Sequence, residues 1–357
     1  MSVRLAILGS TGSIGRQALD VAARRRDRVE VRSLAAGRDL DALEAQARAV
    51  RPAMLALEHA ADEAAARARL ALAAPGARIH VGAGAAAQLA AESDATVVLN
   101  GIVGAAGLEA SLRVLERGAR LALANKETLV IGGPLVRAAL ARGGALVPVD
   151  SEHSAALQCL GGRPAREVRR LVLTASGGAL RDHPDWRRAT REEVLRHPVW
   201  TMGGRITVDS ALLVNKALEL IEAHWLFDLD WSRIEAWLHP QALIHALVTF
   251  TDGSMVAQAA PPDMRLPIQL ALSWPERWEE AVAPIEPAAL GALSFAPIAP
   301  GRFPAFDLAL AAIPDVIEQA LAAHPAERVE SFAHVRTVDA AARATAREAV
   351  RAMAVRA

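Results

Sequence analysis

Cysteine is almost absent from this chain of 357 residues, in which Cys159 stands alone. A single cysteine excludes an intramolecular disulfide and a zinc cluster built on thiolates, and it suits a reducing compartment. Net charge is absent too, because 40 basic residues balance 40 acidic ones and no long block carries one sign. We therefore expect neither a nucleic acid nor a membrane among its partners.

Long apolar runs are also missing. No uncharged stretch reaches the length that spans a bilayer, and the opening Met-Ser-Val-Arg leads directly into a short apolar segment. A secretory signal would instead place a basic segment before a longer apolar one. We therefore expect a cytoplasmic protein.

Lysine is scarce, which makes its positions informative. Lys126 and Lys216 are the only lysines among the 40 basic residues, and each follows an asparagine directly, Asn125 or Asn215. In a chain rich in alanine and arginine, codon bias would exchange lysine for arginine wherever any positive charge suffices. A lysine that remains indicates a need for a compact ammonium group. The alternative is chance.

The length and the 52% hydrophobic content allow a substantial core and more than one domain. From Val3 to Val149, short apolar strands alternate with helical patterns. Such alternation predicts an α/β fold that begins with a Rossmann-like, doubly wound parallel sheet.

After Asp150 the pattern becomes mixed. A capping box at Thr190 and Glu193 predicts a helix start, and a turn at 251–253 predicts a hairpin. The expected elements are strands at 170–174, 205–208, 234–238, 242–250 and 254–259, and a helix from Ser210 to Phe227. The chain is thus expected to comprise a Rossmann domain (1–150), a central mixed α/β domain (151–282), a linker (283–304) and a small C-terminal helical domain (305–357).

A glycine-rich loop, Gly9-Ser-Thr-Gly12-Ser-Ile-Gly15, follows the first strand and opens the first helix. Glycines let the backbone approach a pyrophosphate, and the N–H groups at a helix N-terminus face the anion. The loop therefore predicts dinucleotide binding. A tight strand-to-helix turn without a ligand is the alternative.

The end of the second strand distinguishes the two common dinucleotides. NAD-binding proteins place a carboxylate there to accept the ribose hydroxyls, whereas this chain has Gly37 and Arg38. A guanidinium group favours a 2′-phosphate, and hence NADP. The neighbouring Asp39 opposes that choice, and an Arg38 that simply faces solvent is the alternative.

A pair of carboxylates, Asp150 and Glu152, follows the expected strand 146–150. Strand spacing would place both on one side, at the carboxyl end of the sheet, where α/β proteins bind ligands. Two oxygen ligands suit Mg²⁺ or Mn²⁺ better than zinc. Helix capping by Asp150 or Ser151 is a compatible alternative.

Small polar groups gather in the second half. Asn215, Lys216 and Glu219 share one face of the expected helix, at whose start Ser210 lies. Ser176-Gly177-Gly178 can form a nest of backbone N–H groups, and His197 is nearby in sequence. These groups suit a phosphate. A surface helix with an internal Lys-Glu pair, worth about 0.3 kcal/mol, is the alternative.

Taken together, these motifs resemble the 1-deoxy-D-xylulose 5-phosphate reductoisomerases of the non-mevalonate isoprenoid pathway, from Arg4 to about Ala311. The motifs are Gly-Ser-Thr-Gly-Ser-Ile-Gly at 9–15, Ile-Val-Gly-Ala-Ala-Gly-Leu at 102–108, Leu-Ala-Asn-Lys-Glu at 123–127, Pro-Val-Asp-Ser-Glu-His at 148–153, Ser-Gly-Gly at 176–178, Val-Asp-Ser-Ala at 208–211, Asn-Lys at 215–216, His-Pro-Gln at 239–241 and Pro-Asp-Met at 262–264.

The resemblance implies a homodimeric enzyme that isomerises and reduces a small phosphorylated ketose with NADPH and Mg²⁺ or Mn²⁺, with Co²⁺ as a further option. It implies metal ligands at Asp150, Glu152 and Glu219, which with Lys126 form the catalytic set. It implies cofactor contacts from Thr11, Gly12, Ser13, Ile14, Gly37, Arg38, Asp39, Asn125, Glu127, Gly203 and Met264. It implies substrate contacts from Lys126, Ser151, Glu152, Ser176, His197, Trp200, Ser210, Asn215, Lys216 and Glu219, with Trp200 and Met202 on a closing flap.

The chain departs from the family pattern at Arg38-Asp39, where Lys-Asn is common, at Leu212, Val214 and Ala217, and in two further places. Val199 stands in the flap where the family usually has asparagine, and the Asn-Ala-Ala-Asn-Glu helix of the family's C-terminal domain has no counterpart near Ala312. The C-terminal domain is therefore expected to be shortened. Two alternatives follow: a reductoisomerase-like protein that binds nucleotide with little or no turnover, and a metal-independent NADP-dependent dehydrogenase. A semialdehyde enzyme would need a nucleophilic cysteine, whereas Cys159, inside an apparent helix, is expected in the core.

Overall fold

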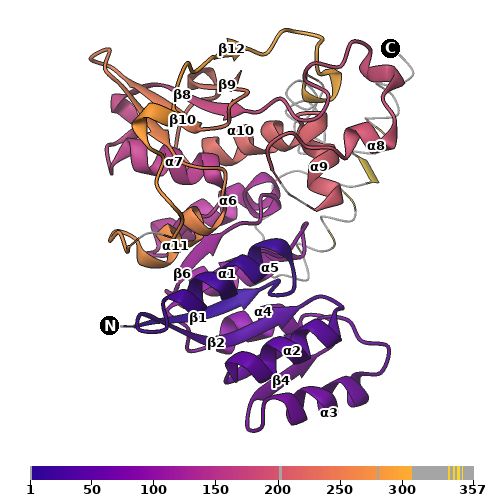
Figure 1. Ribbon diagram of the computed structural model, residues 1–357. Helices are drawn as coiled ribbons and strands as arrows, with labels where there is room; N and C mark the ends of the chain where they lie inside the picture. The colour runs from indigo at the N-terminus through magenta and orange to yellow at the C-terminus, as the bar shows by residue number, and fades with distance from the viewer. Residues whose placement is uncertain are drawn as a thin grey trace.

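The computed structural model describes residues 2–200, 203–279 and 281–307, together with the isolated positions 337, 341, 344, 345 and 348 (Figure 1). Apart from its first residues and those positions, the expected C-terminal domain at 305–357 lies outside this part of the chain. Figure 1 shows two sheets, one from each half of the described chain, with helices α6 and α10 side by side between them.

The first sheet is seven-stranded and has the order β4-β3-β2-β1-β5-β6-β7, with every pairing parallel. Its strands are β1 (Val3–Leu8), β2 (Val29–Ala36), β3 (Met54–Leu57), β4 (Arg78–Val81), β5 (Val97–Asn100), β6 (Arg120–Leu123) and β7 (Ala145–Pro148). The connecting helices are α1 (Ser13–Arg24), α2 (Leu40–Val50), α3 (Glu63–Ala73), α4 (Ala85–Glu92), α5 (Gly107–Glu116) and α6 (Glu127–Ala141). The predicted Rossmann-like sheet is confirmed.

Strand β1 shows why this sequence forms a sheet that is covered on both faces. Leu5 and Ile7 point into one apolar cluster, whereas Ala6 and Leu8 point into the other, as the alternation of side chains along a strand requires. The strand order reverses between β1 and β5. In doubly wound sheets such a switch point opens a crevice at the carboxyl edge, where ligands bind. The fold therefore directs the glycine-rich loop into that crevice.

The second sheet is five-stranded and mixed, with the order β11-β10-β8-β9-β12. Its strands are β8 (Val168–Ala175), β9 (Ile234–Leu238), β10 (Ile244–Phe250), β11 (Met255–Ala259) and β12 (Ala296–Pro297). The helices of this half are α7 (Ser151–Leu160), α8 (Arg191–Val194), α9 (Gly204–Ala211) and α10 (Val214–Phe227). Helix α11 (Arg265–Ser273) instead packs on α1 and on β6 and β7 of the first sheet. The predicted mixed α/β region is confirmed, as are the capping box of Thr190 with Glu193 and the burial of Cys159 in the core of this half.

Two local predictions were wrong. The β-branched residues of 205–208 indicate a strand, but this segment lies in α9, where the Thr207 hydroxyl donates to the Gly203 carbonyl oxygen at 3.0 Å. Tertiary packing thus overrides local β propensity. The expected helix 210–227 is interrupted, because Leu213 adopts a left-handed φ of 55° and α10 starts at Val214. Ser210 therefore belongs to α9.

The segment predicted as a linker contributes to the second sheet, because β12 pairs with β9 through Ala296 and Pro297. None of the helices that the structure describes is long and apolar enough to cross a membrane.

Candidate active site

The candidate cofactor site begins where β1 ends. Gly9 has a left-handed φ of 81°, and the Gly12 N–H donates to the Gly9 carbonyl oxygen at 3.0 Å, so the chain turns tightly into α1. A Cβ atom at Gly15 would collide with that same oxygen, so the helix packs directly on the turn. No side chain caps the first turn of α1. Its N–H groups therefore face the crevice, as a pyrophosphate requires.

Beyond β2, Arg38 is exposed and lines an open depression of about 570 Å³ with His59 and Arg69. The neighbouring Asp39 caps α2, because its Oδ1 accepts the Ala42 N–H at 3.0 Å. The carboxylate that seemed to oppose an anion is thus engaged by the helix. Arg38 can approach a phosphate group from this depression.

Three carboxylates meet beyond the end of β7. Asp150 caps α7, with its Oδ1 accepting the Glu152 N–H at 3.2 Å, and Glu219 comes from α10. Their ligand atoms lie within 4.8 Å of one another. Three oxygen donors in this arrangement suit a hard divalent cation such as Mg²⁺ or Mn²⁺. Capping and metal binding by Asp150 are therefore compatible in this geometry.

Lys126, at the start of α6, enters this carboxylate cluster. Its Nζ contacts Asp150 Oδ2 and lies 3.3 Å from Glu219 Oε1 and 3.8 Å from Glu222 Oε2. Burial lowers the pKa of Lys126, but the surrounding carboxylates outweigh burial and raise the pKa well above its usual value. At Asp150, burial raises the pKa of the carboxyl group, but the charge of Lys126 outweighs burial. The pKa of Asp150 is therefore well below its usual value. Lys126 is therefore a fixed ammonium group at neutral pH.

Lys216 enters the cluster from α10. Its Nζ lies 2.8 Å from Glu152 Oε1 and contacts Glu219 Oε2. Burial lowers the pKa of Lys216, whereas Glu152 and Glu219 raise it above its usual value. The pKa of Glu219 is itself raised, because burial and the charge of Glu152 outweigh the ammonium groups. Both lysines of the chain thus lie buried in one site.

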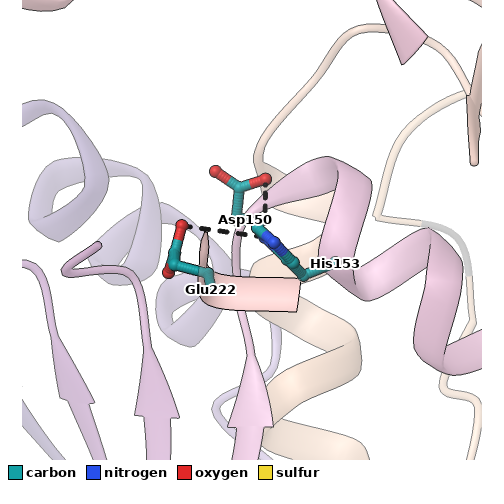
Figure 2. Close-up of side chains that lie close together, drawn as sticks. All are labelled: Asp150, His153 and Glu222. Atoms are coloured by element: carbon teal, nitrogen blue, oxygen red, sulfur yellow. Dashed lines mark ion pairs between the residues drawn. The ribbon is translucent and has the colours of Figure 1, made fainter. Parts of the chain in front are cut away.

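Figure 2 shows the imidazole of His153 beside the carboxylates of Asp150 and Glu222. Its Nδ1 lies 3.2 Å from Asp150 Oδ1 and 3.9 Å from Glu222 Oε2. Its Nε2 is 2.9 Å from the carbonyl oxygen of Glu219, which can only accept, so Nε2 carries a hydrogen. Without a hydrogen on Nδ1, the ring nitrogen and both carboxylates would all be acceptors. A proton between Nδ1 and the carboxylates is therefore required for hydrogen bonding among the three groups.

The pKa values of these groups agree with a shared proton. Burial lowers the pKa of His153, but Glu222 and Asp150 prevail and raise it to about 9. Burial raises the pKa of Glu222 to about 7. The whole cluster thus brings four carboxyl groups, from Asp150, Glu152, Glu219 and Glu222, together with the basic side chains of Lys126, Lys216 and His153.

A second polar region follows β8. Gly177 and Gly178 have left-handed φ values of 86° and 63°, and the Gly178 N–H donates to Ser176 Oγ at 3.3 Å. His197 Nδ1 accepts the Trp200 N–H at 2.8 Å, which leaves the ring hydrogen on Nε2, 3.2 Å from Ser176 Oγ. Burial lowers the pKa of His197, so it is a neutral donor. These groups suit an anionic oxygen.

The loop after β8 lies against the end of α9, because a Cβ atom at Gly178 would clash with the carbonyl oxygen of Ser210. Asn215 follows at the start of α10, where its Nδ2 contacts Glu219 Oε1. The expected phosphate contacts therefore converge from a loop and two helices. Asn215 and Lys216 connect them to the carboxylate cluster.

The sequence matches known proteins over nearly all of the described chain. Family models match residues 5–133 (1-deoxy-D-xylulose 5-phosphate reductoisomerase), 146–227 (its C-terminal domain) and 259–313 (DXP reductoisomerase C-terminal domain). A curated protein of that name from Symbiobacterium thermophilum is 51% identical over 298 residues, which cover 83% of this chain and 77% of the relative. The chain belongs to the 1-deoxy-D-xylulose 5-phosphate reductoisomerase family. The resemblance inferred from the motifs is confirmed.

Other members of the reductoisomerase family extend the match to the whole length. A relative from Heliobacterium modesticaldum is 42% identical, with 98% of both chains covered. The reductoisomerase of Zymomonas mobilis in complex with NADPH has a TM-score of 0.84 at 32% identity, with 97% of this chain and 98% of that one covered. A reductoisomerase structure with NADPH, fosmidomycin and magnesium has a TM-score of 0.86 at 30% identity, with 98% and 99% covered.

The remaining residues expected from the reductoisomerase family have varied surroundings. Asn125 is buried beside Glu127 near the loop after β5. Met264 packs against the same apolar cluster as Ile14. Gly203 caps α9 and is exposed, well before the cluster on α10. These positions stay predicted cofactor contacts.

The flap predicted for a reductoisomerase is described only in part, because Met202 lies outside the described residues. Trp200 lies with its ring centre 6.2 Å from that of His245, and it lines a small cavity with Ser151. Trp200 is thus adjacent to helix α7, which carries Glu152.

Two residues of this cluster were not singled out in the sequence as site residues, His153 and Glu222. Each stands three positions after a predicted ligand, His153 after Asp150 and Glu222 after Glu219, on the same helix face. That spacing is the signal by which they could have been found. The sequence motifs direct attention to the predicted metal ligands rather than to the side chains that contact those ligands.

Proposed function

We propose that this chain converts 1-deoxy-D-xylulose 5-phosphate into 2-C-methyl-D-erythritol 4-phosphate, with NADPH and a divalent cation. One observation carries the proposal: Asp150, Glu152 and Glu219 meet both lysines beside a crevice into which the glycine-rich loop turns. Membership of the reductoisomerase family supports the substrate and product.

The three carboxylates fit Mg²⁺ or Mn²⁺, with Co²⁺ as a further option, since the ligand atoms are all oxygen and already gathered. When bound, such a cation supplies Lewis-acid stabilisation for charge that develops on the ketone and neighbouring hydroxyl oxygens. The reductoisomerase structure that contains magnesium supports this assignment.

The side chains around the cation divide the remaining work. Lys126 stays protonated, so it holds and stabilises substrate oxygens as a hydrogen-bond donor and does not act as a base. Glu152, which accepts a hydrogen bond from Ser151, positions a substrate hydroxyl for loss of its proton.

A phosphate group of the substrate is proposed to bind away from the reacting carbons. Ser176 and Ser210 offer hydroxyl groups and His197 offers its imidazole N–H, and Asn215 and Lys216 complete this set from α10. Binding there orients the carbon chain at the cation. Trp200 is proposed to close over the substrate and exclude water.

NADPH is proposed to lie along the crevice between β1 and β5. Its pyrophosphate would face Thr11, Gly12, Ser13 and Ile14, and its 2′-phosphate would face Arg38. The complexes of reductoisomerases with NADPH support this choice over NADH. Gly37, Asp39, Asn125, Glu127, Gly203 and Met264 complete the proposed cofactor contacts.

The competing dehydrogenase function would need no metal, and its semialdehyde form would need a reactive thiolate. Burial raises the pKa of the Cys159 thiol to about 11, so it is a poor nucleophile at neutral pH. The test is the oxidation of NADPH by 1-deoxy-D-xylulose 5-phosphate with Mg²⁺ or Mn²⁺, with the product identified by NMR. Binding of NADPH without product in either metal would favour the inactive alternative.

We also propose a homodimer. Strand β11 is an edge of the second sheet, and Met255 and Val256 on it are 52% and 43% exposed, which suits pairing with a second copy. Val256→Asp should then yield a monomer in light scattering, whereas an unchanged mass would place the interface elsewhere. The domain limits at 150, 282 and 304, and a cytoplasmic location, stay predictions.

A further inference from the structure

The loop at 101–106 has no helix or strand of its own, yet it lies directly on the glycine-rich loop. The Gly101 N–H donates to the Leu8 carbonyl oxygen at 2.9 Å, and a Cβ atom at Gly9 would lie 2.8 Å from the Gly101 oxygen. The loop therefore forms one wall of the crevice. Its conformation is held by side chains as well as by backbone hydrogen bonds.

Two asparagines at the ends of neighbouring strands hold this loop. Asn100 Oδ1 accepts the Ile102 N–H at 3.1 Å, and its Nδ2 donates to the Gly107 carbonyl oxygen at 2.8 Å. Asn125 Nδ2 donates to the carbonyl oxygens of Ile102 at 2.5 Å and Gly104 at 2.9 Å. The loop is thus held from both sides.

Two buried hydroxyl groups join the asparagines. Asn100 Nδ2 donates to Ser111 Oγ at 2.8 Å, Ser111 Oγ is 3.2 Å from Thr128 Oγ1, and Thr128 Oγ1 donates to Asn125 Oδ1. Because Thr128 gives its hydrogen to Asn125, Ser111 has to donate to Thr128. All four side chains are at most 2% exposed.

This direction of donation fixes the Asn125 amide. Its Oδ1 accepts from both the hydroxyl and the N–H of Thr128, the latter at 2.7 Å, so its Nδ2 must face the loop. A reversed amide would oppose carbonyl oxygens of the loop and leave buried groups unpaired, which costs about 1–3 kcal/mol. The hydroxyl groups thereby act on the loop through Asn125, which directly precedes the N-cap of α6.

We propose that Ser111 and Thr128 are positioning residues that, through Asn100 and Asn125, shape the loop at 101–106 for the nicotinamide half of the dinucleotide. This inference rests on the proposed binding of NADPH. The adenosine half is recognised near Arg38, on the other side of β1, and does not depend on this hydrogen-bond chain.

The test compares the dissociation constants of NADPH and of 2′-phospho-ADP-ribose, which lacks the nicotinamide. Thr128→Val keeps the shape of the side chain and removes its hydroxyl. It should weaken NADPH binding about tenfold, leave the fragment unaffected, and be rescued by Thr128→Ser. Ser111→Ala should give the same pattern, and it carries the test if Thr128→Val does not fold.

A matched control is Ser33→Ala, which removes a buried hydroxyl bonded to Ser93 at 2.8 Å in the same half of the molecule. Ser33→Ala should leave the dissociation constants of both NADPH and 2′-phospho-ADP-ribose unchanged. Equal weakening of NADPH and the fragment by Thr128→Val, or no weakening of either, would overturn the inference. If the unaltered protein bound neither ligand, the proposed function itself would fail.

Discussion

The dinucleotide side and the catalytic side of the site use different kinds of groups. On the first, the proposed contacts come mainly from backbone at the glycine-rich loop and α1. The charged side chain that is expected to choose the cofactor, Arg38, is exposed. On the second, Lys126, Lys216 and Glu219 are buried. The geometry of a backbone site depends on the fold, whereas the geometry of a site of buried charges depends on the interactions among those charges.

This difference has energetic consequences. Removal of one member of a buried ionic cluster leaves its partners uncompensated, which typically costs 3–5 kcal/mol in roughly comparable cases. An exposed guanidinium has no such partners to disturb, so its loss affects only the ligand it contacts. The two sides should therefore respond separately to substitution.

The largest effect is expected at Glu152. Glu152→Gln removes a charged metal ligand and a partner of Lys216, so kcat should fall roughly 10³-fold. Fluorescence titration should give an NADPH affinity within about twofold of the original, because Glu152 is not among the proposed cofactor contacts. Glu167→Gln, at a surface pair with Arg163, serves as the control. Loss of NADPH binding in Glu152→Gln would contradict the claim that the dinucleotide side and the catalytic side respond separately to substitution.

A smaller effect is expected at Glu222, which reaches Asp150 through His153. Glu222→Gln should weaken Mn²⁺ binding about 10- to 100-fold, as substitutions behind a metal ligand do. Calorimetry on the substrate-free protein measures this directly. Glu235→Gln, which alters a half-exposed pair with Arg170, should not change Mn²⁺ binding. Full Mn²⁺ affinity in Glu222→Gln would show that Asp150 needs no such support.

Arg38 tests the dinucleotide side. Arg38→Ala should weaken NADPH binding roughly 10- to 100-fold, since a charge-assisted hydrogen bond to phosphate is lost, and it should leave NADH binding unaltered. Arg26→Ala, at another exposed arginine, gives the comparison. An equal loss for both dinucleotides would contradict recognition of the 2′-phosphate.

The smallest effect on turnover is expected at Cys159, which belongs to neither the dinucleotide side nor the catalytic side. Cys159→Ala should keep activity within about twofold, since the thiol has a packing role in the core. Burial raises the pKa of the Cys159 thiol from 9.0 to about 11 in the folded protein. Above pH 9 the thiol therefore ionises in the unfolded chain while it is still protonated in the folded one. Stability should fall as the pH rises through that window, and urea unfolding of Cys159→Ala should lack this component. A large loss of activity would revive a thiol mechanism.

Sequence patterns predicted the first sheet well because its strands are buried on both faces and alternate with amphipathic helices. They failed at 205–208, where a β-branched run became α9, because packing decides such short segments. Asp150 and Glu152 do lie together as expected, but the expected strand spacing was wrong, because β7 ends at Pro148 and Glu152 lies in the first turn of α7. The role of Glu222 could not be predicted, because its contact with His153 joins helices far apart in the chain.

One experiment on the unaltered protein tests the central claim most directly: NADPH affinity and NADPH oxidation by 1-deoxy-D-xylulose 5-phosphate, each measured in EDTA and again after Mg²⁺ is restored. If buried carboxylates hold a catalytic cation and a separate backbone site holds the cofactor, NADPH should bind equally well in both conditions. Oxidation should be absent in EDTA and return with Mg²⁺. Substrate-dependent oxidation in EDTA would contradict the account and favour a metal-independent dehydrogenase.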